Sequence, residues 1–183
     1  SKLLEKNIHF TFLATIPLVV VIIILSTEIV TTFGSDFKDS GIILTILLIS
    51  YPILIVNTAI FFLLHAKGYY KEVLYIGLFA NIPRIILYFI MIPEFGSIGA
   101  AYAMVAGVFL QFIPTIIIAR KLHIRIHYTK YVIMTTISYG LGTTMFLFES
   151  NIISAIIVFI GSYILYLKFK ILDKQIIKEL CKF

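Results

Sequence analysis

Long apolar runs alternate with short polar segments along most of this chain. Runs of this kind lie near residues 10–33, 41–64, 73–92, 97–119, 131–148 and 152–167. A hydrocarbon layer about 30 Å thick needs a helix of about 20 residues, and all but the short last run reach that length. The last run is flanked by tyrosines and lysine, which suit a membrane interface. The pattern predicts an all-α integral membrane protein, built as a six-transmembrane-helix bundle over residues 1–168.

The composition supports lipid as the solvent of these runs. Hydrophobic residues make up 61% of the 183 residues and charged residues only 13%, whereas soluble domains carry about 25% charged residues. The formal net charge of +6 comes from bases in the short segments between apolar runs. This distribution is typical of membrane topology, so we expect membrane lipid and not nucleic acid as a partner.

The basic residues predict an orientation. Of the 15 lysines and arginines, all but Lys38 and Arg84 fall before the first run, between the second and third, between the fourth and fifth, or after the sixth. Cytoplasmic loops carry the excess of positive charge in membrane proteins. We therefore expect a multi-pass protein of the cytoplasmic (plasma) membrane with both termini in the cytoplasm.

The segment 169–183 is too polar to span a membrane. Its apolar residues approximate helical spacing with lysines between them, which favours either an amphipathic cytoplasmic helix on anionic lipid or a solvated tail. The lone cysteine, Cys181, lies in this segment and has no partner for a disulfide within the chain. The first residue is serine, which is compatible with a fragment or a processed product, and no cleavable signal peptide is predicted.

Arg84 is the first candidate for chemistry. It lies 11 residues after Val73, roughly 16 Å into the third run and so near its middle. Asn81 and Tyr88 fall on the same helical face. A central arginine is costly in lipid, so it should face a cavity or an acid. Two interpretations stay open: a bidentate contact to an anionic substrate group, or a structural ion pair.

A few other polar residues lie inside the apolar runs. Glu28, near the outer end of the first run, suits proton or Na⁺ coupling, an exposed interfacial carboxylate, or a partner for Arg84. Asn57 and Gln111, with the prolines Pro17, Pro52 and Pro114, are expected to break helices beside a cavity or to shape packing. No metal-ligand spacing, cofactor motif, paired carboxylates or nucleophile–base arrangement is seen, so the chain is not expected to be an enzyme.

A specific motif joins the third and fourth runs, Ile-Pro-Glu-Phe-Gly-Ser-Ile-Gly-Ala-Ala, from Ile92 to Ala101. Pro93 and Gly96 predict a tight turn. Gly99, Ala103 and Gly107 then share one helical face that lets two helices approach closely. An apolar helix, this motif and a second apolar helix resemble the C-terminal half of polysaccharide flippases, in the multidrug/oligosaccharidyl-lipid/polysaccharide exporter superfamily.

The resemblance implies one lobe of a two-lobe transporter that moves a lipid-linked oligosaccharide or polysaccharide precursor by alternating access. Members of the superfamily enclose a central cavity, and some exchange substrate for H⁺ or Na⁺. Cationic cavity residues are thought to hold the lipid diphosphate, and Arg84 matches that role, with Asn81, Tyr88, Asn57 and Gln111 as further candidate contacts. The missing half would be an N-terminal six-helix lobe or a second copy of this chain.

Three alternative functions can be compared with this one by the residues that each would require. A multidrug or cation antiporter lobe would favour an acidic cavity, whereas the central charge here is positive. A transferase acting on polyprenyl phosphates would need acidic metal ligands in loops, and only Asp36 and Asp39 lie close in sequence. A non-transporting structural subunit of a membrane assembly, or a truncated pseudogene product, would also fit the sequence.

Overall fold

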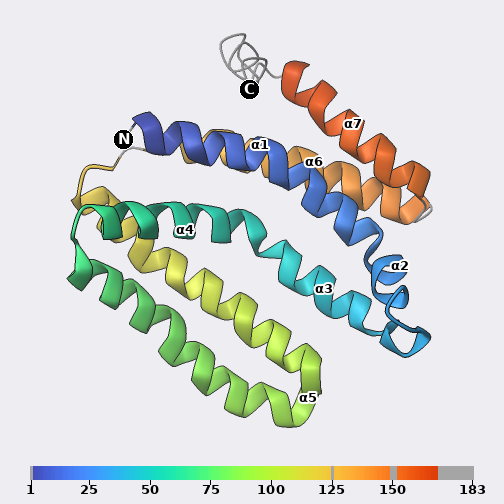
Figure 1. Ribbon diagram of the computed structural model, residues 1–183, viewed down its shortest axis with the longest axis horizontal. Coiled ribbons are helices and arrows are strands. Elements are labelled where there is room, and N and C mark those ends of the chain that lie inside the picture. Colours follow the sequence, from blue (N-terminus) through green and yellow to red (C-terminus); the bar gives the residue numbers. More distant parts are fainter. Residues whose placement is uncertain (1, 125, 149–151, 169–183) are drawn as a thin grey trace.

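The computed structural model describes residues 2–124, 126–148 and 152–168, and within these ranges the chain is helical with no β-strand (Figure 1). The elements are α1 (Lys2–Ile24), α2 (Ser26–Thr31), the 3₁₀ turn η1 (Ser35–Phe37), α3 (Ser40–Ile49), α4 (Tyr51–Ala66), α5 (Tyr70–Lys121), α6 (Tyr128–Phe148) and α7 (Ile152–Lys168). The predicted all-α class is confirmed. The predicted tail helix, 169–183, lies outside the described residues.

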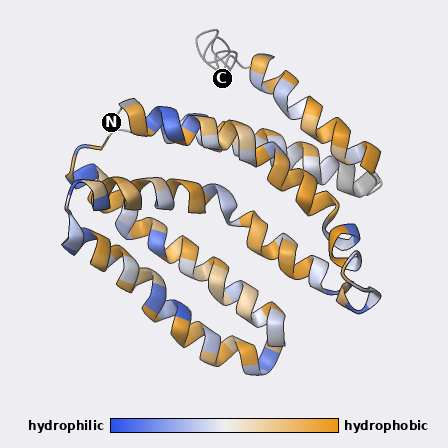
Figure 2. Ribbon diagram, viewed as in Figure 1, coloured by the Kyte–Doolittle hydropathy of each residue, from blue (hydrophilic) through white to orange (hydrophobic). Residues whose placement is uncertain are grey.

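Length and hydropathy identify the helices that could cross a membrane. Helices α1 and α5 each qualify alone, and α3 with α4 makes a third if the pair, bent by 51°, is one broken span. Figure 2 shows mostly apolar residues along these helices, with hydrophilic residues at their ends and also midway along α5. Two or three such helices are compatible with a membrane protein.

The helix breaks differ from the expected ones. The apolar run 41–64 is divided at Ser50, whose hydroxyl donates to the Leu47 carbonyl at 2.8 Å, and Pro52 lies in the first turn of α4. The predicted break at Pro52 is thus confirmed. Pro17 and Pro114, like Asn57 and Gln111, instead lie inside continuous helices. The expectation of a helix break is therefore wrong at these positions, and the alternative, a role in helix packing, remains. Neighbouring helices and local adjustment can satisfy the carbonyls that such prolines leave free.

Helix α5 is a hairpin. Its backbone leaves helical geometry at Gly96, where φ is 57° and ψ is −134°, a conformation that is readily adopted only by glycine. Figure 1 shows α5 doubling back near this position. We call residues 70–95 the first arm and residues 97–121 the second arm; each is roughly 37–39 Å long. The predicted tight turn is confirmed at Gly96, although the first arm continues past Pro93 and ends only there.

The core is centred on α1 and on α4, which packs against both α1 and α5. Fully buried side chains from α1, α4, α5, α6 and α7 meet there, among them Phe12, Ile60, Ile76, Met134 and Tyr166. The first arm of α5 contributes little to this core, and many of its apolar side chains point outward, with Phe89 79% exposed. Large exposed apolar surfaces mark contact with lipid or with another protein.

Helices α6 and α7 are joined by buried hydroxyl groups. The Tyr166 and Ser138 hydroxyls lie 2.6 Å apart. The Tyr166 hydroxyl also donates to the Met134 carbonyl at 3.2 Å, and Ser138 donates to the Ser162 hydroxyl at 3.3 Å. Tyr166, Ser138 and Ser162 are all fully buried. These bonds hold α6 and α7 in one register, because each polar group needs its partner in an apolar setting.

Tyr166→Phe should lower the free energy of unfolding by about 1 kcal/mol, because the ring stays but its hydrogen bonds are lost. Unfolding of the purified protein in mixed detergent micelles measures this difference. Tyr75→Phe, at a phenol that is 61% exposed, is the matched control and should change the value by less than about 0.5 kcal/mol. Equal effects of the two substitutions would show that the buried bonds contribute nothing.

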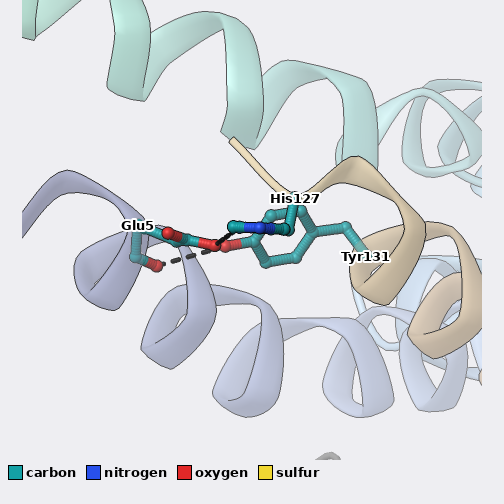
Figure 3. A network of polar contacts seen from close by, with 3 residues as sticks. All are labelled: Glu5, His127 and Tyr131. Carbon is teal, nitrogen blue, oxygen red and sulfur yellow. Dashed lines mark hydrogen bonds and ion pairs between the residues drawn. The ribbon is translucent and has the colours of Figure 1, made fainter. Parts of the chain in front are cut away.

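The start of α1 is tied to the start of α6 (Figure 3). The Tyr131 hydroxyl donates to the Glu5 carbonyl at 3.1 Å, and His127 Nδ1 lies 2.5 Å from Glu5 Oε1. The His127 side chain is 69% exposed, so the ion pair itself contributes little. Tyr131 is buried, and its bond fixes the start of α1 against α6.

Candidate functional site

Arg84 lies midway along the first arm of α5 and packs on the second arm. It is half-buried. A methyl group at position 107 would lie 2.5 Å from Arg84 Nε and 3.2 Å from Arg84 Cβ, so only glycine at position 107 leaves room for the arginine as placed. The face of Gly99, Ala103 and Gly107 was expected to let two helices approach closely. At Gly107 it packs against the Arg84 side chain.

The charge of Arg84 is not neutralised by the part of the chain that the structure describes. Its Nε is buried and has no hydrogen-bond partner. No described carboxylate lies within ion-pair distance of it, including that of Glu28. A buried donor without a partner costs about 1–3 kcal/mol, and more when charged. The Arg84 guanidinium therefore has a donor without an acceptor, and an anionic ligand would supply that acceptor.

Asn57 of α4 meets the same segment of the second arm. It is only 1% exposed, and its Nδ2 donates to the Val108 carbonyl at 3.1 Å. Its Oδ1 is buried without a partner. Val108 directly follows Gly107, so two of the predicted site residues contact adjacent positions of one helix. The first arm, the second arm and α4 are thereby linked through the segment 107–108.

The remaining candidates on the first arm are more open. Asn81 is exposed and Tyr88 half-buried. Tyr88 lines an apolar depression of about 450 Å³ with Ile85 and Phe89, which Arg84 does not line. Asn81, Arg84 and Tyr88, predicted to share one helical face, all lie on the first arm, but Asn81 and Arg84 do not line the depression that Tyr88 lines.

None of the hydrogen bonds and ion pairs of the described residues joins Gln111 or Glu28 to Arg84. Gln111 is half-buried on the second arm, and its backbone carbonyl accepts a hydrogen bond from the Thr115 hydroxyl at 2.8 Å. Glu28 is exposed on α2, and its carbonyl accepts the hydroxyls of Thr31 and Thr32, each at 3.0 Å. The proposed coupling role of Glu28 stays a prediction. Within the described ranges, no group of three or more acidic, histidine or cysteine side chains could hold a metal ion.

Sequence reasoning missed one polar feature, at the end of α5. In the sequence analysis Arg120 contributed only to the predicted membrane orientation. In the structure, Arg120 and Tyr128 line the same groove between helices. Burial raises the pKa of the Tyr128 phenol above its usual value of 10.0, and the Arg120 guanidinium partly opposes the shift. The phenol therefore stays protonated at neutral pH and can donate a hydrogen bond. The sequence does contain a signal for this feature, a cation at the end of an apolar helix. Basic residues in ordinary loops give the same signal, so it does not identify a groove.

The chain was also compared with known proteins. No protein-family model, curated protein or solved structure matches it.

Proposed function

We propose that this chain is one lobe of a membrane transporter that moves a lipid-linked oligosaccharide or polysaccharide precursor across the cytoplasmic membrane. In this proposal the chain crosses the membrane six times, through α1 with α2, α3 with α4, each arm of α5, α6 and α7. Figure 1 supports the alternation. The α4–α5 and α5–α6 connections lie on the side where α1 begins, and the α2–α3 connection and the α5 turn lie opposite.

The single observation that carries the proposal is Arg84, a cation midway along an apolar arm with no acidic partner among the described residues. An unpaired charge at membrane depth is expensive and usually serves function. A lipid diphosphate brings anionic oxygens to that depth, which a guanidinium can hold through two parallel hydrogen bonds. A cationic drug would be repelled from the same place.

The second part of the proposal is a partner lobe. The first arm exposes apolar side chains together with Asn81. An N-terminal six-helix lobe, or a second copy of this chain, would cover the polar positions and complete a central cavity. Rocking of two lobes around a site near the midplane needs no catalytic group.

The experiment is a flipping assay in vesicles. The chain is reconstituted at a density where chemical crosslinking shows its oligomer, with a fluorescent disaccharide on polyprenyl diphosphate. Flipping should expose the inner-leaflet label to an impermeant quencher faster than in protein-free vesicles. Equal rates would contradict the proposal. Efflux of a cationic dye under an H⁺ or Na⁺ gradient, without glycan flipping, would instead identify an antiporter lobe.

Cysteine labelling tests the proposed topology. With Cys181 replaced by serine, single cysteines are placed at Lys67 and Lys121, and at Lys38 and Glu94; all four positions are exposed. An impermeant maleimide added to intact cells should label positions 38 and 94 only, because the positive-inside rule places the basic connections in the cytoplasm. Labelling of position 121 from outside would overturn the orientation.

A further inference from the structure

A second cavity lies away from Arg84, at the end of the molecule where α5 ends and α6 begins. It is a groove of about 500 Å³ between α1, α4, the second arm of α5 and α6. Its walls include Phe12, Val56, Phe112 and Ile116. The Thr135 hydroxyl on the α6 wall donates to its own helix, to the Tyr131 carbonyl at 2.8 Å. The body of the groove is therefore apolar, and its wall from Phe112 to the end of α5 runs about 12 Å.

One end of this groove is cationic. Arg120 lines it there, is exposed, and has no ion-pair partner in the described part of the chain. The Tyr128 phenol shares the lining. Its ring meets Phe112 edge-on, with centroids 6.5 Å apart, which fixes the phenol at the mouth between α5 and α6. Glu5, the acid on the start of α1, lies against His127. The mouth thus offers a cation and a hydroxyl donor beside an apolar channel.

We propose that this feature, the Arg120 groove, binds an anionic glycerophospholipid of the membrane, with the headgroup phosphate at Arg120 and an acyl chain along the apolar wall. The amphiphilic shape of the groove matches that of the ligand. Guanidinium holds phosphate through parallel hydrogen bonds, and phenol donates a further one. A packed protein helix would fill the apolar wall but leave the cation unmatched. A lipid with its own ammonium group would bring a like charge near Arg120 and Lys121. This site is separate from Arg84 and does not depend on transport.

The test is native mass spectrometry of the purified chain with added phosphatidylglycerol or phosphatidylcholine of the same acyl chains. Arg120→Gln should weaken phosphatidylglycerol binding at least about tenfold, because charged hydrogen bonds are lost. Lys121→Gln removes the same charge one residue away, outside the groove lining. It should change phosphatidylglycerol binding less than about threefold. Phosphatidylcholine binding should be weaker in wild type and unchanged by either variant.

A steric variant gives an independent readout. Ile116→Trp should fill the groove and reduce binding of both lipids, while a melting temperature near that of wild type shows that the fold survives. Equal losses from Arg120→Gln and Lys121→Gln would overturn the proposal, since only general charge would then matter. No preference for phosphatidylglycerol in wild type would also overturn it. Tenfold tighter binding of a polyprenyl phosphate would reject the phospholipid as the occupant.

Discussion

Arg84→Ala is expected to reduce flipping of a lipid-linked glycan at least about a hundredfold while leaving folded protein in the membrane. Two charge-assisted hydrogen bonds to a diphosphate account for a loss of this size. No acid pairs with Arg84 in the described part of the chain, so removing it strands no opposite charge. Folding should then be preserved or improved, because Nε is buried without a partner. Flipping rate and melting temperature are measured on the same preparation.

Two matched variants separate the charge of Arg84 from its position. Arg84→Lys should keep part of the activity, because the charge remains and the bidentate fork is lost. Gly107→Ala should impair flipping with the arginine still present, because the new methyl would lie 2.5 Å from Nε and displace the side chain. Normal flipping by Arg84→Ala would reject the binding role. Loss of activity only in step with loss of folded protein would assign Arg84 to structure.

Gly99→Ala is expected to disrupt the α5 hairpin, with a loss of about 3 kcal/mol or more in the free energy of unfolding. A methyl at position 99 would lie 2.2 Å from the Met91 carbonyl oxygen and 2.6 Å from its carbon. These are backbone atoms, so the arms must separate instead of a side chain rotating. Overpacking typically costs about 1–3 kcal/mol and more where the backbone is forced to move.

Gly77→Ala is the control for that experiment. It changes the same residue type in the same helix, but nothing lies within 4 Å of the new methyl. In a helix this change is neutral or stabilising by up to about 1 kcal/mol. Unfolding of wild type and both variants in mixed micelles measures the differences. A Gly99→Ala protein as stable as Gly77→Ala would mean that the arms are not in contact at Met91.

The helical segments were predictable because apolar runs of this length leave few alternatives. The run 97–119 falls inside the second arm, and 152–167 matches α7 to within a residue. The ends of helices were less predictable. Pro93 is a helix breaker by local propensity, yet the first arm continues to Gly96, where only glycine allows the required backbone. Leu25, which separates α1 from α2, carries no sequence signal for a break.

The sequence identified the candidate site residues but did not predict how they are arranged in space. Arg84 stood out because a central cation in an apolar run is costly. Its contact with Gly107 depends on the angle at which the arms return, which spacing alone does not fix. Asn57 bonds to Val108 across 51 positions of sequence, and such a pairing follows only from how α4 packs. The Arg120 groove also arises from helices distant in sequence.

The turn at Gly96 bears on how the chain would be made. In the proposed topology the two arms meet at a single non-helical residue, so no long hydrophilic loop has to be moved across a bilayer between them. The arms would then leave the ribosome and enter lipid together, as one paired unit. Arg84 would arrive with Gly107 already beside it, so the insertion machinery would not meet an isolated helix with an uncovered arginine. In the proposed topology the hairpin would thus be a biosynthetic unit as well as a structural one.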